Sequence, residues 1–343
     1  MAGRPSDPAA ARLAAQQLTD RSGRTPTEVV RNLLAVQAQD QRGARLAIRS
    51  RSVGVASTDV DESLNNREMV VSWLNRGTLH LVCAEDYWWL HPLTTPQLRT
   101  ANARRLRQEG VTAPHLQRAS DVIVASVATG PKTRSDIRAR LDGAGIPTAG
   151  QALVHILVAA TIEGLVVRGP MIGKDQAFVS VAAWLGSPPT AIERAPALAR
   201  LAHRYLASHA PASDDDLANW AGITLGEARQ GLEAARQIDP PTRKGLPAPR
   251  LLGPFDPLLH GWKTRSFVLG DHKSVITTNG VFRPVALVGG RVVGTWGLRS
   301  GIINIVPLEP VADDAVTLLK QDAQDVLRFL GLPERPATVT GIS

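Results

Sequence analysis

The spacing of hydrophobic positions predicts a recurring order of elements along the chain. Helices are expected from Asp7 to about Leu18 and, after the capping box Thr25-Pro26-Thr27-Glu28, over residues 29–36. A short helix near residues 59–66 precedes two strands, 69–74 and 78–83, around the turn at 75–77. Helices followed by a two-stranded ribbon are typical of a winged helix.

The same order returns further along the chain. Thr133 begins a helix through Leu141, and a second helix over residues 151–163 stops at Gly164. Strands at 165–168 and 177–180 flank a glycine-rich tip. A third copy begins with a helix over 191–208 and continues with two capped helices, the second over 226–237. The pattern therefore predicts three tandem winged-helix units, although their spacing follows no fixed period.

The pattern then changes to strands. Residues 240–249 are rich in proline and predict a linker, and strands are expected at 266–269, 282–288, 291–298 and 302–306 before a final helix over 313–330. The prediction is an α+β fold with four domains: 1–130, a first winged-helix unit with flanking helices; 131–190, the second unit; 191–240, the third; and 250–343, a C-terminal β domain with a terminal helix.

Composition narrows the class of protein. The 343 residues are 43% hydrophobic, as in a globular protein, and 39 Lys and Arg against 31 Asp and Glu give a net charge of +8. A basic balance favours a polyanionic partner. The single cysteine, Cys83, lies in an apolar run and fits core packing in a reducing compartment. Without a signal region or an apolar run of about 20 residues, we expect a cytoplasmic protein that makes no membrane contact.

Basic residues gather on two predicted helices. One carries Arg99, Arg104, Arg105 and Arg107, and the other carries Lys132, Arg134, Arg138 and Arg140. Each cluster by itself is commonly a solvated helix face. Their coincidence with helix-turn-helix patterns indicates DNA binding.

Most site chemistries are missing from the sequence. It has no phosphate-binding glycine loop, no dinucleotide fingerprint, no zinc-ligand spacing and no nucleophile elbow. We therefore expect no cofactor and no metal. One short element stands out: Gln37-Ala38-Gln39 places two amides two residues apart, after a helix. In an extended segment both point to the same side and converge on one ligand or water. Alternatively, they cap the preceding helix.

Four segments together resemble the AlkZ/YcaQ-like winged-helix DNA glycosylase family, from Thr25 to about Gly331. They are Gln37-Ala38-Gln39, Trp73-Leu74-Asn75-Arg76-Gly77-Thr78-Leu79-His80, Leu252-Gly253-Pro254-Phe255-Asp256-Pro257, and residues 279–296. The resemblance implies three tandem winged helices plus a β domain, forming a C shape around a basic DNA channel.

The resemblance also implies an activity, which is monofunctional excision of N-alkylated purines from double-stranded DNA, including bulky N7-guanine adducts and interstrand crosslinks. The family's Gln-x-Gln or Gln-x-Asp motif is catalytic, and Gln37 and Gln39 match it. The Gln-x-Gln branch is associated with self-resistance to DNA-alkylating natural products. A β-hairpin of the family's C-terminal domain enters the minor groove, and we look for it within residues 265–280. We expect a monomer whose DNA contacts include Arg76, Arg104, Arg105, Lys132, Arg134, Arg265, His272 and Lys273.

Other interpretations stay open. Asp40 supplies a carboxylate beside the glutamines, and Asp256 suits a turn cap better than chemistry. Residues 141–149 superficially resemble a helix-hairpin-helix phosphate clamp. Winged helices also serve transcriptional regulators, which show a strong preference for one DNA sequence. An inert relative would bind alkylated DNA without cutting it.

Overall fold

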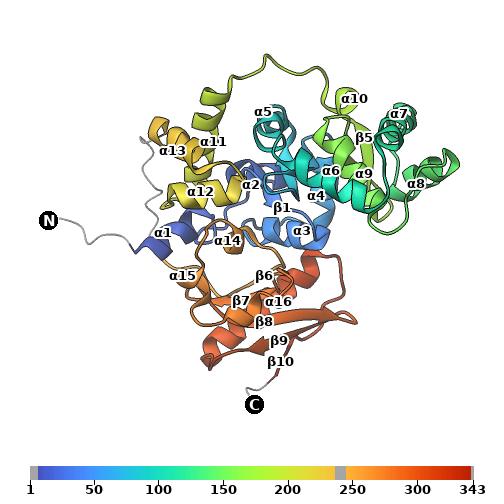
Figure 1. Ribbon diagram of the computed structural model, residues 1–343. Helices are drawn as coiled ribbons and strands as arrows, with labels where there is room; N and C mark the ends of the chain where they lie inside the picture. Colours follow the sequence, from blue (N-terminus) through green and yellow to red (C-terminus); the bar gives the residue numbers. More distant parts are fainter. Residues whose placement is uncertain (1–6, 236–244, 341–343) are drawn as a thin grey trace. The chain divides into compact units, whose positions relative to one another are not determined.

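The computed structural model describes residues 7–235 and 245–340, and the chain divides into two compact units (Figure 1). Unit 1 combines Met1–Val60 with Leu198–Ser343, whereas unit 2 is the continuous segment Asp61–Ala197. The first half of the predicted proline-rich linker, residues 240–244, lies outside the described residues. The chain has an α+β fold, as predicted, while the division into four domains stays a prediction.

The N-terminal helices of unit 1 begin at the residues that the sequence indicates. The Asp7 side chain caps α1 (Pro8–Ala15), and Thr25 and Glu28 form the predicted capping box of α2 (Pro26–Leu33), with Thr25 N donating to Glu28 Oε2 at 2.8 Å. Two short elements were not predicted. They are β1 (Val36–Gln37) and α3 (Gln41–Arg49), and the second is followed by α4 (Ser57–Asn65), which reaches into unit 2.

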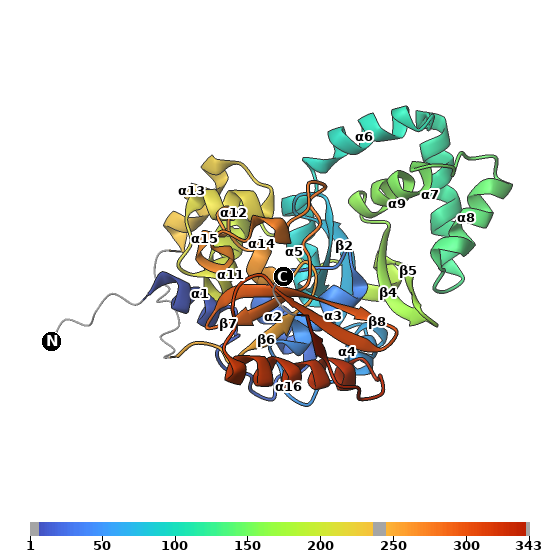
Figure 2. The ribbon, with the colours of Figure 1, turned by 90° about the horizontal axis from the view of Figure 1, so that it is seen from below.

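The C-terminal part of unit 1 is a sheet with the strand order β10-β9-β8-β7-β6. Its strands are β6 (Arg250–Leu252), β7 (Val285–Val288), β8 (Arg291–Arg299), β9 (Ile302–Pro307) and β10 (Thr338–Val339). Gly289 and Gly290 both have positive φ, 56° and 81°, which gives the tight β7–β8 hairpin that the sequence predicts. The terminal helix α16 (Asp313–Phe329) runs along this sheet and contacts β6 (Figure 2).

Between these parts, unit 1 holds a helix-turn-helix. It follows the long helix α11 (Arg194–His209), which starts in unit 2, and consists of α12 (Asp214–Ala221) and α13 (Leu225–Ala234). Gly222 adopts the left-handed conformation in the turn, with φ 71°. Among the described residues the next strand is β6, which pairs with β7 of the C-terminal sheet. A count of three winged helices therefore stays a prediction.

The strands of unit 2 pair with one another in antiparallel fashion, in the order β3-β2-β4-β5. Its strands are β2 (Met69–Leu74), β3 (Thr78–Cys83), β4 (Val166–Ile172) and β5 (Asp175–Ser180), and its helices are α5 (Ala84–Thr94), α6 (Leu98–Gln108), α7 (Ala113–Ala128), α8 (Arg134–Gly143), α9 (Ala152–Ile162) and α10 (Val181–Leu185). Helices α8 and α9 followed by the β4–β5 pair match the order predicted for residues 131–190 and differ from a helix-hairpin-helix. The wing is tighter than expected, because its strands extend to Ile172 and Asp175.

The strand predicted at residues 266–269 is wrong, because this segment is the helical turn α15 (Ser266–Leu269). Val268 and Leu269 are both buried, whereas neighbouring residues of a strand project to opposite faces. The rest of the segment to residue 280 contains the 3-10 turn η1 (Lys273–Val275) and a tight loop. An antiparallel bridge joins Ile276 to Phe282 around this loop, and Thr277 N donates to Val281 O at 3.0 Å. The groove-entering hairpin predicted within 265–280 stays a prediction. Among the described residues, no helix is both long and apolar enough to span a bilayer.

Candidate functional site

The two glutamine amides converge, as their spacing predicts. The α2 helix ends at Leu34, whose φ of 66° turns the chain sharply into the extended residues of β1. Side chains two positions apart then share a side, and Gln37 Nε2 donates a 2.8 Å hydrogen bond to Gln39 Oε1. The amides therefore pair with each other, and this hydrogen bond does not cap the preceding helix.

The two glutamines differ in their exposure. The side chain of Gln37 is 6% exposed, whereas Gln39 is exposed to solvent. Gln37 Oε1 is buried without a hydrogen-bond partner in the structure, and an unmet acceptor of this kind costs free energy. The buried amide thus holds the exposed one in place, and Gln39 presents its remaining lone pair and its NH₂ group outward.

The neighbouring carboxylate has a structural task. Asp40 is the N-cap of α3, and its Oδ1 accepts a 2.6 Å hydrogen bond from Gly43 N. A carboxylate that caps a helix satisfies one of its free N–H groups and complements the helix dipole. This contact favours a role for Asp40 in placing the turn after the glutamines over a role in chemistry.

The helix after the glutamine motif, α3, packs against the Leu252-to-Pro257 motif within unit 1. A Cβ atom on Gly43, in the first turn of α3, would lie 2.4 Å from Pro254 O, and one on Gly253 would lie 2.8 Å from Leu46 Cβ. Only glycine fits at both positions, so α3 and the motif approach backbone to backbone. The second motif therefore supports the helix that follows Gln39.

Asp256 completes this support and is not exposed to substrate. Its carboxylate is 0% exposed, accepts from Arg51 Nη1 and Nη2 at 2.9 and 2.8 Å, and caps α14 (Pro257–His260) through Leu258 N. The structure thus confirms the turn-cap interpretation and adds a buried ion pair. The preceding residue, Phe255, has a φ of 58°, which is strained for a side chain of its size.

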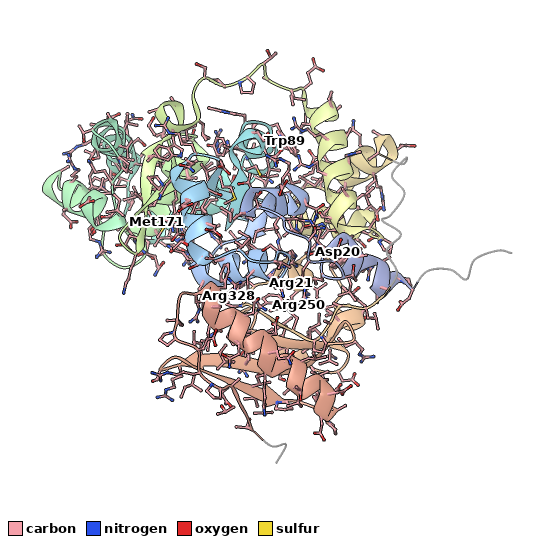
Figure 3. The ribbon with its side chains drawn as sticks, turned by 180° about the vertical axis from the view of Figure 1, so that it is seen from behind. Asp20, Arg21, Trp89, Met171, Arg250 and Arg328 are labelled. Atoms are coloured by element: carbon pink, nitrogen blue, oxygen red, sulfur yellow. The ribbon has the colours of Figure 1, made fainter. Side chains whose placement is uncertain are left out.

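Two further arginines, Arg21 in the loop before α2 and Arg49 of α3, join the N-terminal segment to α16 in the same unit. Arg49 donates to both Asp322 and Asp325, and Arg21 Nη2 reaches Asp325 Oδ2 at 2.9 Å. Burial acts to raise the pKa of Asp325, but the charge of Arg49 and the hydrogen bonds from Arg21 and Arg328 outweigh it, and the pKa lies below its usual range. Figure 3 shows Arg21 beside Arg250 at this junction.

Two histidines are buried in neutral form, and this argues against their use as general acids. Burial lowers the pKa of His209 to about 3 and that of His80 to about 4. His209 is stacked on Tyr205 with ring centroids 4.5 Å apart, and its carbonyl accepts from Trp262 Nε1. Both histidines, and Trp262, therefore belong to the packed interior.

The predicted DNA-contacting residues fall in both units. Five side chains are exposed, namely Arg76, Arg104, Arg105, Arg134 and Lys273, and three are partly buried, namely Lys132, Arg265 and His272. Two of the three already have partners in their own unit: Arg265 Nε donates to Leu259 O at 2.6 Å, and His272 Nε2 lies 2.8 Å from Glu309 Oε2. These two contacts weaken Arg265 and His272 as DNA ligands.

Sequence reasoning predicted strands at 291–298 and 302–306 but did not single out the basic tip between them. The β8–β9 turn has Ser300 and Gly301 at φ 51° and 76°, and the flanking Arg299 and Ile302 are exposed. Arg335 Nη1 donates to Ser300 O at 3.2 Å, which brings a second cation to the tip. The signal for this hairpin was present in Arg299-Ser300-Gly301, between two strands of alternating pattern.

Residues 30–329 match the family model described as "DNA glycosylase AlkZ-like". The chain therefore belongs to the AlkZ-like DNA glycosylase family, an assignment that favours an enzyme over a transcriptional regulator.

Among known proteins, the chain is similar to one of Streptomyces sahachiroi. It is 23% identical over 376 residues to that organism's interstrand DNA cross-link repair glycosylase, with 96% of this chain and 97% of the relative covered. The solved structure of the Streptomyces sahachiroi DNA glycosylase AlkZ superimposes with a TM-score of 0.75 at 22% identity, covering 97% of this chain and 98% of that one. The second likeness establishes the shared fold.

Proposed function

We propose that this DNA glycosylase hydrolyses the N-glycosidic bond of N-alkylated purines in duplex DNA, with Gln37 and Gln39 as the catalytic pair. The observation that carries the proposal is the 2.8 Å bond from Gln37 Nε2 to Gln39 Oε1, which fixes an exposed amide on a buried one. The substrate range includes N7-alkylguanine, bulky adducts and interstrand crosslinks. The Streptomyces sahachiroi relative, an interstrand DNA cross-link repair glycosylase, supports the crosslink part of this range. The proposal extends to self-resistance to a DNA-alkylating natural product.

The chemistry suits amides that are neither acids nor bases. A purine alkylated at N7 or N3 already carries positive charge, so it leaves without protonation when the C1′–N bond breaks and takes the bonding electrons. Gln39 Oε1 has one lone pair on Gln37 and a second that accepts from a water. That water attacks C1′ of the oxocarbenium-like sugar and loses its proton to solvent. Pre-positioned dipoles of this kind stabilise charge without reorganising.

The β8–β9 hairpin is our candidate for the element that enters the minor groove. Its support is an exposed tip that combines the cation Arg299 with the apolar Ile302, a pairing suited to phosphates and unstacked base steps. The cations predicted in both units, led by Arg76, Arg104, Arg105, Lys132, Arg134 and Lys273, belong to one chain, so we expect the enzyme to act as a monomer.

The test is single-turnover release of 7-methylguanine, and of a bulky N7-guanine adduct, from duplex DNA. Gln39→Ala should lower the rate about 100-fold or more, the scale for removing one pre-positioned dipole. Gln37→Ala should cost less, because it acts through Gln39. The matched control is Gln230→Ala, an exposed glutamine of α13 that should leave the rate unchanged.

The outcomes separate the parts of the proposal. A near-normal rate in Gln39→Ala would remove it from the mechanism, and no release by the wild type would overturn the assigned substrates. The ratio of rates on the two substrates distinguishes general repair, with preference for 7-methylguanine, from resistance, with preference for the bulky adduct.

A further inference from the structure

Arg168 occupies an unusual position in the sheet of unit 2. It lies on β4, where it pairs with Val71 of β2 on one side and Phe178 of β5 on the other. Phe178 in turn exchanges both backbone hydrogen bonds with Lys132, at 3.0 and 2.7 Å. Cross-strand partners project to the same face, so Arg168 and Lys132 flank Phe178 on one face of the sheet.

Two aromatic rings hold the guanidinium. Its carbon lies 4.9 Å from the ring centroid of Trp73 and 5.1 Å from that of Phe178, within the range of a cation–π contact. The side chain as a whole is partly exposed, but Nε is buried and has no hydrogen-bond partner. The rings fix the orientation of the guanidinium and leave part of its donor fork free.

The charges around Arg168 are positive. Burial lowers the pKa of Arg168 to about 10, and the charge of Arg134 lowers it further, so the group stays charged at neutral pH. Within the described part of the chain, no carboxylate forms an ion pair with Arg168. The carboxylate of Asp136, near Lys132, accepts the hydrogen bonds of Thr133 in the cap of α8. Partly buried cations that gather without a counter-ion form a site for an anion.

We propose that Arg168, together with Lys132 and Arg134, binds a phosphate group, and that the ligand is a backbone phosphodiester of duplex DNA. This assignment rests on the proposed function, which supplies the DNA. A guanidinium fork suits two phosphate oxygens, and the two flanking cations neutralise the remaining charge. Arg168 is thus a DNA-positioning residue on the wing strand, remote in sequence from the glutamine pair.

The experiment measures the affinity for an undamaged duplex across a series of salt concentrations. Arg168→Met keeps an apolar stem between the rings and removes the charge. We expect it to weaken binding about tenfold and to lower the slope of log K against log salt by about 0.9, the value for one phosphate contact. Arg168→Lys should restore the slope and only part of the affinity. The control is Arg229→Met, which removes an arginine paired with Asp214 at 2.7 Å and should change neither quantity.

Melting temperature separates this role from a structural one. A phosphate site predicts that Arg168→Met melts at or above the wild-type temperature, because a desolvated cation is replaced by an apolar group. A lower melting temperature with an unchanged salt slope would overturn the proposal and make the arginine a packing residue. A further result would overturn a DNA phosphodiester as the ligand. In it, inorganic phosphate raises the melting temperature of the wild type, while wild type and Arg168→Met show the same salt slope for duplex binding.

Excision on the same proteins keeps the two proposals distinct. At saturating protein, Arg168→Met should release alkylated base at the wild-type single-turnover rate, because it acts on binding alone. If the salt slope falls in Arg168→Met but the wild type frees no base, the proposed function is refuted and the phosphate site stands. If the wild type frees base and the salt slope is the same in both proteins, the phosphate site is refuted and the proposed function stands.

Discussion

Removing the carboxylate of Asp256 tests whether this motif residue supports the fold or takes part in catalysis. In Asp256→Ala, the Arg51 guanidinium loses two hydrogen bonds of 2.8 and 2.9 Å, and α14 loses its cap at Leu258 N. Both charged side chains are 0% exposed, so no water replaces the lost oxygens directly. Arg51 keeps its bonds to Gln16 and to the carbonyl of Ala47.

The size of the effect follows from these contacts. An orphaned partner of a buried ion pair costs about 3–5 kcal/mol, and loss of a helix cap costs about 1 kcal/mol. Since domains of this kind are stable by roughly 5–15 kcal/mol, Asp256→Ala should remove a large share of the free energy of unfolding. Asp256→Asn keeps one acceptor for the cap and for Arg51, so its loss should be smaller.

Urea denaturation at pH 7 measures the effect, with Asp271→Asn as the control, because Asp271 is an exposed aspartate of the same unit. Single-turnover excision is then measured at a temperature at which every variant is folded. The structural reasoning predicts an unstable Asp256→Ala enzyme with a near-normal rate. A loss of stability below about 1 kcal/mol would refute the energetic argument. A stable but inactive variant would make Asp256 part of the chemistry.

Three further outcomes follow from the packing, the buried histidines and the hairpin. Gly43→Ala should lower the free energy of unfolding in urea by about 1–3 kcal/mol, because its Cβ would lie 2.4 Å from Pro254 O. Gly226→Ala, whose Cβ has nothing within 4 Å, should lose none. Equal stabilities of the two variants would contradict the close approach. Burial lowers the pKa of His209 to about 3 from about 6.5 in the unfolded chain, so the unfolded state takes up the extra proton and the melting temperature should fall as the pH drops below 6.5. His209→Gln should flatten that fall, and an unchanged pH profile would disprove the assignment. Arg299→Ala should weaken duplex binding similarly for all sequences and lower the salt slope by roughly one, while a sequence-dependent effect would argue against a phosphate contact.

Most of the elements that were predicted correctly are marked by residues close together in the sequence. The capping box at Thr25 and the glycine pair at 289–290 each define a boundary with residues adjacent in sequence, and both are present in the structure. The α3 helix was missed because its buried face includes arginines, which a hydrophobic pattern counts as exposed. The partners of Arg49 lie 273 and 276 positions away, and no local pattern contains them.

In the candidate site, too, contacts between residues close in sequence were predictable and contacts between distant residues were not. The convergence of Gln37 and Gln39 was predictable, because it depends only on the two-residue period of extended backbone. The isolation of Arg168 between two aromatic rings was not, because Trp73 reaches it through strand pairing across 95 residues of sequence. The wrong strand at 266–269 came from reading β-branched and aromatic content without the burial of two successive residues.

The discontinuity of unit 1 has a consequence for how the enzyme is made. Arg51 and its carboxylate partner are 205 positions apart, and the whole of unit 2 is translated between them. A nascent chain therefore carries Gln37 and Gln39 early but cannot pair Arg49 and Arg51 with their carboxylates until the C-terminal residues have left the ribosome. Unit 2, which is continuous, can fold during synthesis. Prematurely terminated chains would thus contain the glutamine motif and unit 2 but lack the carboxylate partners of Arg49 and Arg51, and we expect them to release no base.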